Sequence, residues 1–126
     1  GRGPLLLIVP VPEDGAPLWV LRMARAASDG GYRVQLFDAP LPCSELPLAV
    51  ERFQAEALLL ASGKAEKAEL VRRQLPRLAE QIEVPLMACG PMARIREADL
   101  EETRVALLGD DLGEAMQRLQ ARLPVR

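Results

Sequence analysis

The residues most able to do chemistry are two adjacent acids, Glu13 and Asp14, which follow an unbroken apolar run at residues 5–9. Neighbouring carboxylates act as an acid and a base when the pKa of one of them is perturbed. Paired acids in a loop are more commonly solvated, or they stabilise the N-terminus of the next helix. We therefore expect no catalytic role for this pair and predict that the chain is not an enzyme.

Histidine is absent from the whole chain, and Cys43 and Cys89 are its only cysteines. Without an imidazole, the chain has no Ser-His or Cys-His catalytic pair and no histidine ligand for a metal. Two thiols are too few for a zinc site. Two cysteines in a domain of ordinary composition indicate reduced thiols and a cytoplasmic location. The sequence thus predicts no metal site.

The composition indicates a single globular domain. Of the 126 residues, 49% are hydrophobic and 27% are charged, and the net charge is −2. A slightly acidic chain is a poor ligand for a nucleic-acid backbone, and no apolar run reaches the roughly 18 residues of a membrane span. The chain begins with glycine instead of methionine. We expect residues 1–4 to be a linker, residues 5–126 to be one domain, and the whole to be part of a longer protein.

Hydrophobic periodicity predicts five strands alternating with helices. Apolar runs at residues 5–9, 57–61 and 84–89 indicate strands buried on both faces, whereas the alternation at 32–37 is typical of an edge strand. Residues 104–108 form the last predicted strand. Helices are predicted at 17–29, after a capping Ser44, around 71–82 with a kink at Pro76, at 92–98, and at 112–123 after a capping box beginning at Asp111.

This alternation predicts a parallel sheet between two helical layers, with the flavodoxin-like strand order 2-1-3-4-5. Five loops then meet at the carboxyl edge of the sheet, namely residues 10–16, 38–43, 62–64, 90–91 and 109–111. Open α/β folds bind their ligands at this edge. The first loop offers prolines and acids, which do not suit a phosphate or flavin, and no glycine-rich phosphate motif is present.

A phospho-acceptor receiver domain shares this topology but fits the residues poorly. Glu13 and Asp14 match its acidic pair. The acceptor aspartate is replaced by Ser62, and the lysine expected after the fifth strand is replaced by Gly109. Two of the three essential parts are therefore missing, and we set this hypothesis aside.

Four short segments point to another family: Gly30-Gly31-Tyr32-Arg33-Val34 at the second strand, Leu60-Ala61-Ser62, Cys89-Gly90, and Gly109-Asp110-Asp111-Leu112-Gly113-Glu114-Ala115. In these segments the chain resembles the cobalamin-binding domain of methionine synthase, of corrinoid-dependent mutases and of light-sensing MerR-type transcription regulators. The resemblance extends over nearly the whole chain. It implies a flavodoxin-like fold with a ligand slot beside the first strand.

The histidine motif of this family is degenerate here. The family pattern is Asp/Glu-x-His-x-x-Gly; in this chain Glu13 keeps the acid, Gly15 replaces the cobalt-ligating histidine and Leu18 replaces the closing glycine. The resemblance implies that Leu18 crowds the slot for the nucleotide tail of the ligand. It also implies that Ser62 lines this slot and that Gly90 keeps half of a glycine pair. Alternatively, Ser62 caps a helix and Gly90 only turns the chain.

The resemblance implies a non-catalytic effector or dimerisation domain of a MerR-type transcription regulator. The resemblance also implies that such a domain can form a homodimer and contacts DNA only through a separate upstream domain. We expect no cofactor, with cobalamin binding at most weakly and without a histidine ligand. Three alternatives remain. The chain is a corrinoid-binding subunit of a methyltransferase or mutase, or an α/β protein that binds a different small molecule. The third is an enzyme that acts on a small molecule through Glu13 or Asp14.

Overall fold

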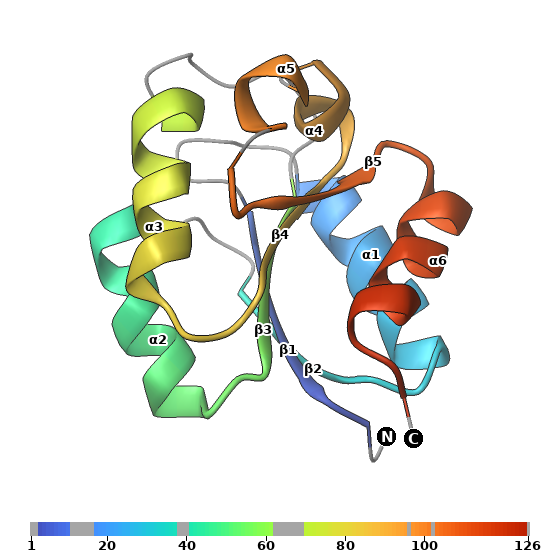
Figure 1. Ribbon diagram of the computed structural model, residues 1–126. Helices are drawn as coiled ribbons and strands as arrows, with labels where there is room; N and C mark the ends of the chain where they lie inside the picture. Colours follow the sequence, from blue (N-terminus) through green and yellow to red (C-terminus); the bar gives the residue numbers. More distant parts are fainter. Residues whose placement is uncertain are drawn as a thin grey trace.

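The computed structural model describes residues 3–10, 17–37, 41–61, 70–95, 97–101 and 103–125 (Figure 1). One parallel sheet contains the five strands in the order β2-β1-β3-β4-β5. The strands are β1 (Leu5–Pro10), β2 (Arg33–Leu36), β3 (Ala57–Ala61), β4 (Leu86–Cys89) and β5 (Ala106–Gly109). The predicted flavodoxin-like topology is therefore confirmed.

Helices cover both faces of this sheet (Figure 1). On one face lie α2 (Leu46–Phe53) and α3 (Leu75–Gln81), and on the other lie α1 (Pro17–Asp29) and α6 (Leu112–Arg122). A 3₁₀ turn, η1 (Cys43–Glu45), leads into α2, and a π-helical turn, η2 (Leu70–Gln74), leads into α3. Two short helices, α4 (Pro91–Ile95) and α5 (Glu97–Leu100), separate β4 from β5. Within the described residues, no helix has the length and apolarity needed to cross a membrane.

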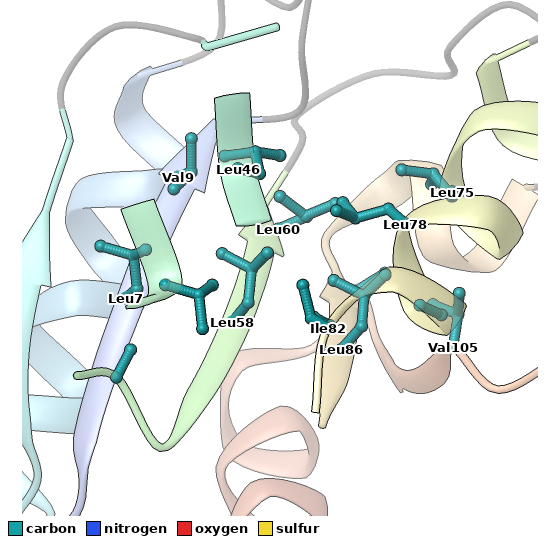
Figure 2. Close-up of a cluster of buried hydrophobic side chains, with 14 of the residues drawn as sticks. Leu7, Val9, Leu46, Leu58, Leu60, Leu75, Leu78, Ile82, Leu86 and Val105 are labelled. Carbon is teal, nitrogen blue, oxygen red and sulfur yellow. The ribbon is translucent and has the colours of Figure 1, made fainter. Parts of the chain in front are cut away.

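The apolar runs of β1 and β3 are buried on both faces, as predicted. Successive side chains of a strand point to opposite faces. Leu7 and Val9 accordingly pack in the cluster beneath α2 and α3 (Figure 2), whereas Leu6 and Ile8 pack beneath α1 and α6. All five residues of β3 are buried. Burial on both faces explains why these segments need no polar position.

The second strand lies at the edge of the sheet, and its apolar and polar side chains point to opposite faces, as predicted. Val34 and Leu36 pack against the cluster under α1 and α6, whereas Arg33 is exposed. The Arg33 guanidinium donates a hydrogen bond of 2.9 Å to the carbonyl of Gly3 and lies 3.6 Å from the carboxylate of Glu56. Arg33 therefore links the start of β2 to Gly3 and to the residue that precedes β3.

The helical segment around Pro76 changes from π-helical to α-helical winding just before the proline, and the kink itself stays a prediction. The π-helical turn η2 ends at Gln74, and Pro76 is the second residue of α3. A proline supplies no N–H to the preceding turn, so a helix that contains it adjusts its hydrogen bonding there. The buried side chains of α3 are those of the predicted apolar face, Leu75 and Leu78, together with Ala79.

Several predicted boundaries are wrong. The fourth strand begins at Leu86 instead of Val84; the carbonyl of Pro85, just before it, accepts a hydrogen bond from Leu58 N–H of β3. The fifth strand begins at Ala106 instead of Arg104. The single helix expected at residues 92–98 is two short helices, α4 and α5.

The predicted capping role of Ser44 is also wrong, because Ser44 lies inside the 3₁₀ turn η1 and neither helix start receives a side-chain cap.

Candidate functional site

The carboxyl ends of β1, β3, β4 and β5 lie side by side. Pro10 pairs with Ala61, Ala61 with Cys89, and Cys89 with Gly109. The loops after β1, β3, β4 and β5 therefore begin at one edge, as the topology predicted. Of these loops, residues 90–91 and 109–111 are described, and the loop after β2 is described from residue 41.

Three of the five predicted ligand-binding residues, Glu13, Gly15 and Ser62, lie outside the described residues. Leu18 lies in the first turn of α1, and 61% of its surface is exposed. Gly90 directly follows β4 in a left-handed conformation with φ of +95°. The structure thus places Leu18 at the surface and Gly90 at the carboxyl edge, and the binding roles of all five residues stay predictions.

Gly90 has a structural role of its own. Its N–H donates a hydrogen bond of 2.8 Å to the carbonyl of Gly109, and its own carbonyl accepts one of 3.0 Å from Ala93 N–H. The first bond joins the ends of β4 and β5, and the second forms the first turn of α4. A positive φ favours glycine because a Cβ atom crowds the backbone there. The turn therefore accounts for glycine at this position without a ligand.

The aspartate side chains in the described part of the carboxyl edge bond to other groups of the protein. The Asp110 carboxylate lies 2.7 Å from Nε of Arg94, so this ion pair joins α4 to the end of β5. The Asp111 carboxylate accepts a hydrogen bond of 2.9 Å from Glu114 N–H and caps α6 as predicted. The Glu114 carboxylate accepts from Arg118 instead of completing the reciprocal bond of a capping box.

Cys89 is not a reactive thiol in the folded protein. It is the last residue of β4 and is fully buried, and this burial raises the pKa of its thiol far above the ordinary range. A thiol is nucleophilic and binds metals as the thiolate, which such an environment disfavours. Among the described residues, no group of three or more histidine, cysteine, aspartate or glutamate side chains comes together as a metal site would require.

A polar groove of about 710 Å³, which was not predicted from the sequence, lies between the turn η1 and the helical segment formed by η2 and α3. It is lined by Cys43, Ser44, Arg73, Gln74, Arg77, Leu78 and Gln81. Arg73 and Arg77 are four residues apart and both exposed in this groove, so their positive charges repel each other and together make the groove attractive to an anion. This spacing was visible in the sequence, but only the packing of α3 beside η1 shows that the arginines share a groove with Ser44.

A second, smaller groove of about 330 Å³ lies at the β2 end of the molecule and is also new. We call it the edge groove; its lining residues are Phe37, Leu41, Glu45, Leu48, Ala49, Arg52 and Phe53. The rings of Phe37 and Phe53 meet edge to face with centroids 5.6 Å apart. Leu48 is 57% exposed. The edge groove is thus mostly apolar, with one acid and one base among its lining residues.

No protein-family model and no curated protein matches this sequence. Among solved structures, a chain of the methanol:cobalamin methyltransferase complex MtaBC from Methanosarcina barkeri is similar, with a TM-score of 0.73 and 10% identity over 90% of this chain and 44% of that chain. The present chain thus spans less than half the length of that one. A Burkholderia pseudomallei protein described as pilus assembly-related has a TM-score of 0.56 and 20% identity, over 98% of this chain and 94% of that chain. At these identities, the comparisons show a shared fold.

Proposed function

We propose that this chain is a non-catalytic effector domain of a transcription regulator, built on a cobalamin-binding type of fold that has lost histidine ligation. The observation that carries the proposal is the combination of this fold with a chain that contains no histidine. Its likeness to a chain of a methanol:cobalamin methyltransferase complex supports the fold type. The degenerate motif at Glu13, Gly15 and Leu18 supports the loss of ligation.

The described part of the carboxyl edge supports a binding role over a catalytic one. Catalytic acids, bases and nucleophiles need a tuned pKa and access to a substrate. Asp110 is held by Arg94, Asp111 caps α6, and the Cys89 thiol is buried and protonated. Each of these groups is used to hold the fold together. A domain of this kind would report a bound molecule instead of transforming it.

Cobalamin does not fit this chain as a histidine-ligated cofactor. A lower cobalt ligand from the protein requires an imidazole, and none exists in the sequence. Cobalamin would bind at most weakly, with its own base still attached to cobalt. Burial of the corrin against apolar surface would supply the binding energy, at about 25 cal/mol per Å².

Titration of cobalamin with the protein, followed by visible spectroscopy, tests this proposal. The wild-type chain should leave the spectrum that of base-attached cobalamin. The double variant Gly15→His with Leu18→Gly should acquire detectable binding if the slot persists, whereas Gly15→Gln with Leu18→Gly, the matched control without an imidazole, should not. Tight binding by the wild-type chain with displacement of the tail base would refute the proposal.

The proposed DNA contact lies outside this chain. With a net charge of −2, the chain has no excess of cations to release counterions from a phosphate backbone. The isolated chain should give no mobility shift with duplex DNA at submicromolar protein. A mobility shift that weakens with salt would contradict the proposal that a separate domain contacts DNA. A helix-turn-helix encoded upstream in the full-length gene would support it.

A corrinoid-carrying domain of a methyltransferase is the second candidate, and the TM-score of 0.73 to the Methanosarcina barkeri chain favours it. The same titration separates the two candidates, because a carrier must hold the corrinoid tightly.

A third candidate, binding of a different small molecule, is favoured by the polar groove with Arg73 and Arg77. Thermal unfolding with and without inorganic phosphate tests for an anionic ligand there, with Arg73→Gln as the control variant.

A further inference from the structure

The edge groove has an exposed apolar side chain, that of Leu48, among its lining residues. Leu48 is the third residue of α2 and keeps 57% of its surface accessible, although most large apolar side chains in the described residues are buried. Beside it in the groove lie Ala49, which is small, and the packed rings of Phe37 and Phe53. An exposed leucine beside an apolar groove can be buried by a partner whose surface is complementary in shape.

The charges on this surface are arranged so that it complements itself. Glu45 precedes Leu48 by three residues and Arg52 follows it by four, and both line the edge groove. In the part of the chain that the structure describes, neither forms an ion pair. Along the sequence, the point halfway between Glu45 and Arg52 falls between Leu48 and Ala49. A two-fold axis at that point would place Glu45 of each copy opposite Arg52 of the other.

We propose that two copies of this chain associate through the edge groove, with their α2 helices antiparallel about that two-fold axis. Leu48 of each copy packs over Ala49 of the other, where the small side chain leaves room. Two Glu45–Arg52 ion pairs close the ends of the contact and set its register. This deepens the proposed function, on which it rests for its biological purpose, by naming a second copy as the partner of the domain.

The exposed apolar residues of α1 do not show this complementarity. Leu18 and Leu21 are exposed on α1, 61% and 51% respectively, but Arg22 and Arg25 lie on the same helix surface. Asp29, the acid at the end of that helix, is already paired with Arg25 at 3.2 Å. Two copies of this surface would bring arginines together. The surface around Leu21 therefore serves as a matched control.

Sedimentation equilibrium at low salt tests the proposal on the full 126-residue chain. We expect a weak dimer that is populated at about 100 µM, because a contact centred on one eight-residue helix from each copy lies at the small end of specific interfaces. Glu45→Arg and Arg52→Glu should each raise the dissociation constant by about tenfold or more, since each turns two attractions into repulsions. Leu48→Asp should abolish the dimer, whereas Leu21→Asp should leave it unchanged.

Charge reversal provides the decisive measurement. The double variant Glu45→Arg/Arg52→Glu should dimerise again, and an equimolar mixture of the two single variants should form a heterodimer, because each combination restores opposite charges. Circular dichroism of every variant confirms that it is folded. A wild-type chain that is monomeric at 100 µM, or a dimer that Glu45→Arg and Leu48→Asp leave intact, would overturn the proposal. Either result leaves the cobalamin test of the proposed function unaffected, so the two can fail separately.

Discussion

Replacement of Gly90 by alanine tests whether this predicted binding residue is a glycine for structural reasons. Gly90 has a φ of +95° and bonds to both Gly109 and Ala93 at the end of β4. An L-residue with positive φ costs about 1–2 kcal/mol. Alanine also reduces the entropy of the unfolded chain, but where φ is positive the strain outweighs this gain. We expect the free energy of unfolding to fall by about 1–2 kcal/mol.

Urea unfolding followed by circular dichroism measures this change, and a thermal melt should show a drop of roughly 4 °C for each kcal/mol. Gly113→Ala is the matched control. Gly113 is exposed near the start of α6 and does not have a positive φ, and a Cβ atom there would be 3.4 Å from the Asp111 carboxylate. Alanine is a better helix former than glycine, so this variant should gain up to about 1 kcal/mol.

A Gly90→Ala variant that is as stable as the wild-type chain or as Gly113→Ala would refute a structural requirement for glycine at this position. That result would mean that the turn tolerates a side chain, and that close approach of a ligand is the better explanation of the glycine.

Four further predictions concern the core, the helix cap and the thiols. Leu60→Ala removes a fully buried side chain from the central strand β3 and should lower the free energy of unfolding in urea by about 2–5 kcal/mol; an unchanged midpoint would contradict the burial. Asp111→Ala removes the N-cap of α6 and should cost about 1 kcal/mol in the same assay, whereas Asp111→Asn should retain most of the stability. Labelling with a thiol reagent should modify the half-buried Cys43 in the native protein and Cys89 only after unfolding, and early labelling of Cys89 would argue against its burial. Burial raises the pKa of Cys89, and of Tyr32 in the same sense, so the folded state holds these protons more tightly than the unfolded state. The free energy of unfolding should therefore fall as pH rises above about 8.5, by up to about 1.4 kcal/mol per pH unit for the thiol, and Cys89→Ala should remove that part of the slope.

The candidate site was only partly visible in the sequence. The topology located the edge where the loops after β1, β3, β4 and β5 begin, because strand order follows from the pattern of buried and half-buried strands. The roles of Asp110 and Cys89 depend on what surrounds them. Arg94 reaches Asp110 only because α4 and the end of β5 lie together. The thiol of Cys89 is inert because neighbouring strands and helices enclose it.

The sequence by itself determined the architecture of this protein. A strand buried on both faces is apolar at every position and an edge strand alternates, so β1, β3 and β2 could be identified from local composition. Where β4 and β5 begin depends on hydrogen bonds to neighbouring strands, and those boundaries were misjudged.

Only the tertiary structure decided which distant side chains share a surface. The edge groove joins Phe37 after β2 to Leu48 and Phe53 of α2, and the polar groove joins Ser44 to Arg77 of α3. Helical periodicity orients the residues of one helix relative to each other, but it does not show which helix packs beside it. The crossover connections and the packing of the helices against the sheet determine that, because these contacts join residues far apart in the chain.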